Sequence, residues 1–350
     1  MKLFRLKLTV AILVIGTLLY SCQSTNSLTM SVTEPAPVYL PTSIKNIGIL
    51  NRSLASEKNK SLDAIDQILS IEGKNLDKDG ATYTIQGIKD TFEKDNQYKS
   101  VIIVDSDKIE NPGLGIFPSA IPWETIETVC NENNLEAIVT LSFYDTDAKV
   151  NYNTKTIQSL NAFGVKIPVI EHQATITTNI KAGFRIYDNV NKLIRDEIIT
   201  DQWISSTGKG INPVKAIEAI TGRKEALLQT STNIGNEYAL RTYPYKIRVT
   251  RQYYVKGSQN FEIGKRRAQT GNWNSAAELW EKEIHNPKGK IAGRACYNMA
   301  IINEINGDIE TAITWASKAY TDYNDKNALR YLKTLRYRKK RKRQLEEQSQ

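Results

Sequence analysis

The chain has 350 residues, of which 40% are hydrophobic and 24% charged, which suits a globular protein with room for two modest domains. Its formal net charge is +9. Three of these positive charges precede the first apolar stretch and seven lie in residues 336–343 (RYRKKRKR), and subtracting them leaves −1. The composition therefore excludes the surface-wide positive field of a nucleic-acid-binding protein.

The N-terminus has the pattern of a secretory signal peptide. Its basic residues precede an apolar stretch from Leu8 to Leu19, about a dozen residues, which is too short to cross a bilayer as a helix. The stretch ends in Leu19-Tyr20-Ser21-Cys22, which resembles the bacterial lipobox. An ordinary secretory signal, in which the cysteine falls at this place by chance, is the alternative.

The lipobox resemblance implies where the protein resides. It implies that residues 1–21 are a cleaved signal peptide and that the thiol of Cys22 is diacylated. Several acyl chains make a lasting anchor in a lipid bilayer, whereas one chain alone is marginal. Gln23 follows the cysteine in place of the aspartate that signals retention in the inner membrane, so the resemblance implies an outer-membrane location facing the periplasm, with the cell surface as the other option.

Residues 22–43 are rich in Ser, Thr and Pro and show no apolar periodicity, which predicts a flexible tether after the lipidated cysteine. From residue 44 short apolar strands alternate with helical patterns, which predicts an α/β domain over residues 44–256. Alternating residues 175–187 and their return over 193–203 predict an added antiparallel hairpin in a mixed sheet. The predicted strands that alternate with helices are at residues 47–50, 101–104 and 137–143. After the hairpin come a helix-rich stretch at 213–240 and a last strand at 248–255.

An internal repeat marks the C-terminal part of the chain. The segment from Gly271 to Ala277 aligns with that from Gly307 to Ile313, 36 residues later, which resembles the tetratricopeptide repeat. Small residues at Gly264 and Ala276 would let two helices approach closely, as would Ala300 and Ala312 in the second copy. Trp280 fits the repeat's large position, whereas Ala316, Arg267 and Asn303 depart from the usual pattern. We predict an all-α, tetratricopeptide-like domain over residues 257–335.

The two cysteines outside the signal region, Cys130 and Cys296, lie among apolar helical residues in different predicted domains. We expect buried, unpaired thiols in preference to a disulfide. The two histidines are far apart, and the sequence has no nucleophile elbow, phosphate loop or Cys/His cluster. These patterns predict a protein that is not an enzyme and has no cofactor.

One group of acidic residues could bind a ligand. Two predicted strands each end in Asp-x-Asp, at Asp105 and Asp107 and at Asp145 and Asp147. If the strands are parallel, the four carboxylates meet at one edge of the sheet and could hold Ca²⁺ or Mg²⁺. The alternative is that aspartate is simply a favoured turn residue after a strand.

The basic tail, predicted over residues 336–350, has two interpretations. It could contact anionic lipid, lipopolysaccharide or an acidic polymer. It could equally be a solvated extension of the last helix, and the signal peptide argues against a nucleic-acid partner. The side chains that would make an anionic contact are Arg338, Lys339, Lys340, Arg341, Lys342 and Arg343.

The order of these parts resembles a family of uncharacterised outer-membrane lipoproteins of the Bacteroidota. The resemblance rests on the segment PAPVYLPTSIKNIGILNRS, on Glu72-Gly73 through Phe92, and on RVTRQYY at residues 248–254. It implies no established activity. More distantly, the order of strands and helices is similar to a small domain of curli-secretion and Tol-system envelope proteins, which bind proteins. We predict a membrane-anchored scaffold that binds envelope proteins through its repeat face and hairpin edge, with ligand or divalent-cation binding as the alternative.

Overall fold

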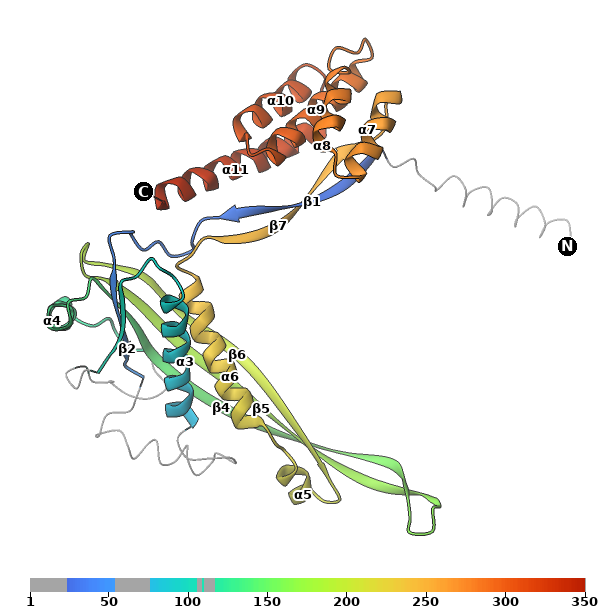
Figure 1. Cartoon of the computed structure of the whole chain (residues 1–350). Helices are drawn as coiled ribbons and strands as arrows, with labels where there is room; N and C mark the ends of the chain where they lie inside the picture. The colour runs from blue at the N-terminus through green and yellow to red at the C-terminus, as the bar shows by residue number, and fades with distance from the viewer. Residues whose placement is uncertain (1–23, 54–75, 106–108, 110–116, 350) are drawn as a thin grey trace, which may run out of the picture. The chain divides into compact units, whose positions relative to one another are not determined.

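The computed structural model describes residues 24–53, 76–105, 109 and 117–349. Cys22 lies outside the described residues. The chain divides into two compact units, which are described separately. Ala36–Pro244 form the main part of one, the α/β unit, and the N-terminal strand together with Tyr245–Glu347 forms the other, the ribbon–helix unit (Figure 1).

The α/β unit is built on a five-stranded mixed sheet with the strand order β3-β2-β4-β5-β6. β2 runs parallel to both β3 and β4, whereas β5 is antiparallel to β4 and β6. The predicted mixed sheet with an added antiparallel hairpin is therefore confirmed. The strands are β2 (Asn46–Asn51), β3 (Ser100–Val104), β4 (Ala137–Leu160), β5 (Lys166–Asp188) and β6 (Leu193–Gly210).

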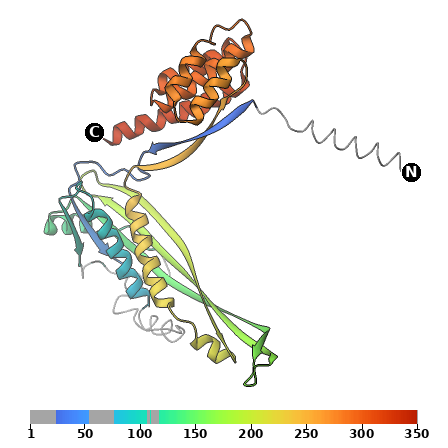
Figure 2. The ribbon, with the colours of Figure 1, turned by 45° about the vertical axis from the view of Figure 1, so that its right-hand side comes forward.

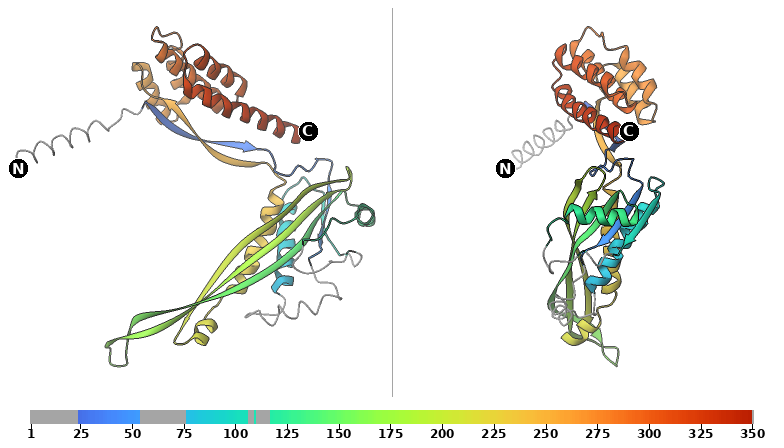
Figure 3. Two further views of the ribbon diagram at one scale, coloured as in Figure 1. Left: turned by 180° about the vertical axis from the view of Figure 1, so that it is seen from behind. Right: turned by 90° about the vertical axis from the view of Figure 1, so that its left-hand side faces the viewer.

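Helices cover both faces of this sheet (Figure 3). Apolar residues of α3 and α6 pack on one face, with Ile88 and Phe92 of α3 fully buried against the strands. Ile126 and Cys130 of α4 pack on the opposite face. The helices of the unit are α3 (Leu76–Glu93), α4 (Trp123–Asn133), α5 (Pro213–Glu218) and α6 (Arg223–Leu240).

Two glycines let α3 and α6 cross in close contact. A Cβ atom on Gly87 would lie 2.2 Å from the carbonyl oxygen of Thr232, and one on Gly235 would lie 2.0 Å from that of Thr84. Backbone atoms cannot move aside as a flexible side chain can, so only glycine fits at either position. This crossing fixes the helix layer over the sheet.

β4 and β5 form a second hairpin, in addition to the predicted one of β5 and β6, and its strands are longer than the sequence pattern predicts. This β4–β5 pair is called the hairpin below. The predicted strand at 137–143 continues to Leu160, and its partner begins at Lys166 instead of at residue 175 (Figure 2). Residues 147–156 are exposed on both faces of the hairpin, because no helix covers them and no second sheet packs on them in the described part of the chain. A strand that is wet on both sides shows no alternation of apolar and polar residues, which is why the pattern missed it.

The ribbon–helix unit begins with a two-stranded ribbon that the sequence pattern did not predict. β1 (Thr25–Glu34) pairs along its whole length with β7 (Tyr245–Tyr254) in antiparallel register. The predicted flexible tether at 22–43 is therefore wrong for residues 25–34. The strand expected at 248–255 exists, but it belongs to this ribbon and does not join the larger sheet. Leu28 and Val32 of β1 are buried, and this burial stabilises the ribbon.

Five helices follow the ribbon, and they confirm the predicted repeat. Gly271 and Gly307, at equivalent positions of the two copies, both have φ +82°, a left-handed conformation that favours glycine. Ala276 and Ala312 are both fully buried, as the predicted close approach of helices requires. The helices are α7 (Gln259–Gln269), α8 (Trp273–Glu281), α9 (Gly289–Ile305), α10 (Ile309–Thr321) and α11 (Lys326–Gln348).

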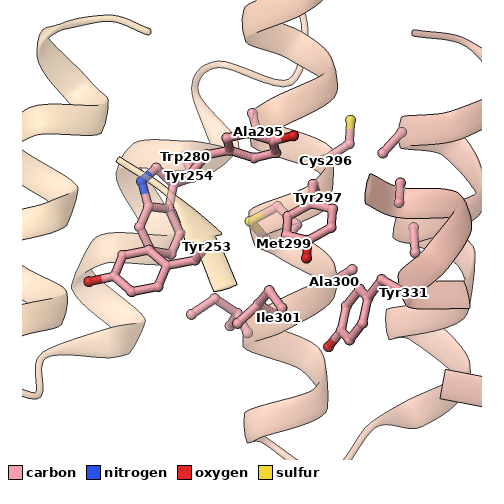
Figure 4. Close-up of a cluster of buried hydrophobic side chains, with 14 of the residues drawn as sticks. Tyr253, Tyr254, Trp280, Ala295, Cys296, Tyr297, Met299, Ala300, Ile301 and Tyr331 are labelled. Carbon is pink, nitrogen blue, oxygen red and sulfur yellow. The ribbon is translucent and has the colours of Figure 1, made fainter. Parts of the chain in front are cut away.

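An aromatic core joins the ribbon to these helices (Figure 4). Tyr253 packs 5.8 Å from Trp280, and Tyr254 packs edge-on against Tyr297 at 5.2 Å between ring centroids. Trp280 is fully buried, and a Cβ atom on Gly264 would lie 2.6 Å from its Nε1. The large residue of the first repeat therefore requires the small residue facing it.

Both cysteines among the described residues are buried and unpaired, as the sequence predicts. Burial raises the pKa of Cys130 and of Cys296 to about 11. Each thiol is therefore protonated at neutral pH, and a protonated thiol is a poor nucleophile. Within the described ranges, no helix combines the length and the hydropathy that a membrane span needs.

Candidate functional site

The Asp-x-Asp pairs are not arranged as their sequence pattern suggests. Asp105 follows β3 and is exposed, and Asp107 lies outside the described residues. Asp145 and Asp147 do not end a strand, because they lie inside β4, where they pair in register with Lys181 and Asn179 of β5. The assumption that both pairs meet at the end of parallel strands is therefore wrong for the second pair.

The described residues contain no group of three or more His, Cys, Asp or Glu side chains that could hold a metal ion. His172 contacts the hydroxyl of Tyr152 through Nδ1, in a pair between the two strands of the hairpin. Nothing in this part of the structure favours the cation-binding alternative.

The basic residues at the C-terminal end are part of a long helix, and two of them are largely buried. α11 continues through residues 336–348 without a break. Arg338 donates from Nη1 to Glu34 Oε1 at 2.8 Å, and Arg341 donates from Nε to Glu34 Oε2 at 2.6 Å. The Glu34 side chain is only 4% exposed. These two arginines therefore hold the end of β1, whereas the sequence pattern placed them either in contact with an anionic partner or on a solvated extension of the last helix.

The other basic residues of this segment face solvent. Lys339 pairs with Glu310 at 2.6 Å and Arg343 pairs with Glu347 at 2.8 Å, but all four side chains are more than half exposed. Lys342 donates to the carbonyl oxygen of Gly307, and Lys340 is exposed. Such pairs contribute little to stability, so these residues stay available to a solvent-borne anion.

A second buried carboxylate lies beside the first. Glu304 of α9, 1% exposed, accepts two hydrogen bonds from the guanidinium of Arg251 on β7, at 2.7 and 2.8 Å. Tyr331 of α11 donates its hydroxyl to the same carboxylate, and burial together with this carboxylate raises the pKa of Tyr331. Arg338 Nε lies 3.9 Å from Glu304 Oε1, so Arg338 lies between the two carboxylates and is common to both.

A buried asparagine fixes the end of the ribbon on α9. Asn298 Oδ1 accepts from the backbone N–H of Tyr254, and Asn298 Nδ2 donates to the carbonyl oxygen of the same residue, both at 2.7 Å. The side chain therefore takes the place of a neighbouring strand at that residue. Sequence reasoning missed both Asn298 and Glu304, although a polar residue inside the apolar helix pattern was the signal that could have identified them.

A buried aspartate closes the turn between β5 and β6. Asp188, whose side chain is fully buried, accepts hydrogen bonds from the backbone and side chain of Asn191 and from Arg195. Burial alone would raise the pKa of Asp188, but these hydrogen bonds outweigh it and hold the pKa below its ordinary value. These bonds tie the turn between β5 and β6 in place, at the opposite end of β5 from the turn that joins β4 to β5.

One edge of the hairpin is open among the described strands. The pairing of β2 with β4 ends at Asn51 and Leu141, where β4 also changes register. From Ser142 to Leu160, β4 has β5 on one side and no described strand on the other. An edge of this kind presents backbone N–H and C=O groups that another strand can pair with. We refer to this stretch as the β4 edge.

Comparison with known proteins identifies two families along the chain. Residues 44–254, which hold the five-stranded sheet and β7, match the model of a domain of unknown function, DUF8603, and residues 262–342, within the helices, match that of another, DUF6340. A search of curated proteins found no significant match.

Two solved structures show a distant likeness to the chain. One is the PelC dodecamer from Paraburkholderia phytofirmans, at 11% identity and a TM-score of 0.23, covering 62% of this chain and 98% of that one. The other, a variant of the same PelC, gives 10% identity and a TM-score of 0.22 with the same coverage. Because the first family model covers more than half of the residues, this chain belongs to the DUF8603 family.

Proposed function

We propose that this chain is a non-enzymatic scaffold of the bacterial envelope, held at the outer membrane by acyl chains on Cys22. In this role its α/β unit offers the β4 edge to an extended segment of a partner protein. The lipobox resemblance of residues 19–22 supports the anchor, and the open backbone of β4 supports the binding role. The second of these observations carries the proposal.

The β4 edge suits strand addition for physical reasons. A partner strand that pairs with it would satisfy a row of backbone groups at once, and this is the basis of affinity in β-augmentation. Residues 147–156 of β4 are exposed, so no rearrangement of the described core is needed before a partner binds. Their side chains are mostly Thr, Asn, Lys and Tyr. Thr and Tyr favour strand pairing, and the polar and charged side chains keep the edge soluble when it is empty.

Charge on the exposed part of β4 disfavours the pairing of two copies in parallel register. Lys149 and Lys155 both lie there, and Asp147 lies at its start. Two copies aligned in parallel register along this edge would bring each of these side chains beside its own copy, and such like-charge pairs destabilise a sheet. A partner strand that carries Asp or Glu opposite the two lysines would be favoured instead, because opposite charges across strands stabilise a pair.

Proline substitution tests this proposal at single-residue resolution. Along an antiparallel strand, consecutive residues direct their N–H groups to opposite sides, so one of Asn153 and Thr154 donates towards β5 and the other towards the open edge. Asn153→Pro and Thr154→Pro therefore form a matched pair. One variant destabilises the hairpin, and the other removes a donor from the open edge only, which thermal unfolding distinguishes.

The readout is recovery of envelope proteins on the full chain from detergent-solubilised membranes. We expect the thermally stable variant to lose proteins that the unchanged chain recovers reproducibly. The proposal is wrong if that stable variant recovers the same proteins in the same amounts. Mass spectrometry of the mature protein tests the anchor separately, with an acylated Cys22 as the expected terminus.

A further inference from the structure

The free end of the β4–β5 hairpin carries large apolar side chains that face solvent. Phe163 is 90% exposed, Leu160 65%, Ile170 60% and Val165 57%. β6 pairs with β5 only as far as His172, so the last part of the hairpin extends beyond both β6 and α5 (Figure 1). We refer to residues 157–170 as the hairpin tip.

These apolar side chains point in several directions. Partners in register share one face of the sheet, so Leu160 and Ile170 lie on one face and Ile167 lies on the other. Phe163 and Val165 are in the connecting turn. A protein surface docked on one face would leave the other apolar face in water, whereas a medium that surrounds the tip covers both.

The turn pairs four of its own backbone N–H groups. The side-chain oxygen of Asn161 accepts from the N–H groups of Phe163, at 3.0 Å, and Val165, at 2.9 Å. The N–H of Gly164 donates to the carbonyl oxygen of Asn161, and the N–H of Asn161 donates to that of Val165. Unpaired backbone groups are the main cost of moving a loop out of water, and these four bonds lower that cost for shallow insertion.

The charge around the tip is positive. The tip itself carries Lys166 and neither aspartate nor glutamate, and Lys155 lies beside it. Glu171, the in-register partner of Lys155, is paired with Lys209 at 3.0 Å. Lysines beside an apolar segment favour a membrane that contains anionic lipids, since their long side chains reach the headgroups while the apolar residues go deeper. A partner protein with a neutral apolar surface would gain no binding energy from these lysines.

We propose that the hairpin tip inserts into the interfacial layer of a bilayer that contains anionic lipids. The insertion is shallow, because beyond His172 no described strand pairs with either edge of the hairpin, and unpaired backbone groups must stay near water. Phe163 and its apolar neighbours occupy the boundary between headgroups and acyl chains, and the lysines stay among the headgroups. This second membrane contact uses neither the exposed residues 147–156 of the β4 edge nor the acyl chains.

A fluorophore at the tip tests this proposal. Ala162→Cys is labelled with an environment-sensitive dye in the purified full chain, reconstituted in vesicles of phosphatidylethanolamine and phosphatidylglycerol. Cys130 and Cys296 are buried, and the unsubstituted chain gives the background of labelling. We expect a blue-shifted emission that lipids with a nitroxide on the acyl chain quench. Val190→Cys, in the turn at the other end of β5, is the matched control and should stay unquenched.

Two further comparisons decide between lipid and protein as the occupant. Phe163→Ser with Val165→Ser should weaken quenching about tenfold, whereas Val190→Ser with Leu193→Ser, which removes two exposed apolar residues away from the tip, should leave it unchanged. Replacing phosphatidylglycerol with phosphatidylcholine should weaken it too. Equal quenching at positions 162 and 190 would overturn the proposal. So would an emission shift without lipid quenching that grows with protein concentration, since that result indicates a second copy at the tip.

Discussion

Replacing Glu304 with alanine should destabilise the ribbon–helix unit far more than any exposed carboxylate does. The side chain is 1% exposed and accepts both donors of Arg251 and the hydroxyl of Tyr331. Glu304→Ala leaves a guanidinium that is only 11% exposed without its partner. Removing one member of a buried ion pair costs about 3–5 kcal/mol, because the remaining charge stays desolvated.

An exposed ion pair between α10 and α11 provides the control. Glu310 and Lys339 are 66% and 55% exposed, although their atoms are only 2.6 Å apart. Exposed pairs contribute at most about 1 kcal/mol, so Glu310→Ala should change the free energy of unfolding little. The two variants differ in burial and not in the type of charge that is lost.

Urea unfolding followed by tryptophan fluorescence measures the difference. Trp273, Trp280 and Trp315 lie in the ribbon–helix unit, so a background with Trp123→Phe and Trp203→Phe reports on that unit alone. With a urea slope of about 2 kcal/mol/M, the expected loss lowers the midpoint by about 2 M.

The double variant Arg251→Met with Glu304→Leu tests the physical reason. It removes both charges, so no unpaired ion remains, and we expect it to be more stable than Glu304→Ala. The single variants Arg251→Met and Glu304→Leu give the sum for comparison. A double variant that loses as much stability as this sum would refute the reasoning that an unpaired buried charge causes the loss. A Glu304→Ala variant that behaves like Glu310→Ala would refute it as well.

Three further predictions concern other parts of the chain. The pKa of Asp188 is lowered in the folded state. Its contribution to stability is therefore complete above the unfolded pKa of about 3.9 and is lost as the pH falls below that value. Asp188→Asn should flatten the pH dependence of thermal unfolding below about pH 4. Gly264→Ala should cost about 1–3 kcal/mol in urea unfolding, since its Cβ would meet Trp280, whereas Gly257→Ala, whose Cβ would have a contact distance of 3.4 Å, should cost less. Cys130 and Cys296 should react with a thiol reagent at pH 8 only after unfolding, and rapid labelling of the folded protein would contradict their burial.

The repeat and the central strands could be predicted because their signals are local. Gly271 and Gly307 mark the same turn in each copy, and the strands β2 and β3 are short, continuous apolar runs, of which β2 is buried. Small residues at Gly264 and Ala276 indicate close helix packing without any knowledge of what they touch. In each case the residues that carry the signal lie within one strand or one copy of the repeat.

The ribbon could not be predicted in the same way. Leu28, Met30 and Val32 do alternate as a half-buried strand requires, so the inference that residues 22–43 have no apolar periodicity is wrong here. These three residues are a short signal, because the partner strand lies more than 200 residues later and no nearby turn connects the two. The pairing of Arg338 and Arg341 with Glu34 spans a longer gap in sequence, of 304 and 307 residues. Their spacing of three residues places both arginines on one helix face, but it does not indicate whether an internal carboxylate or an external anion lies opposite.

Site-specific photo-crosslinking in intact cells tests the proposed binding role most directly. A photo-reactive amino acid at Asn151, on the exposed part of β4, should give a reproducible adduct with another envelope protein. The same amino acid at Val190, which is 57% exposed in the turn at the far end of β5, should give none. If Asn151 gives no adduct, or only the adducts that Val190 gives, the β4 edge is not a binding surface.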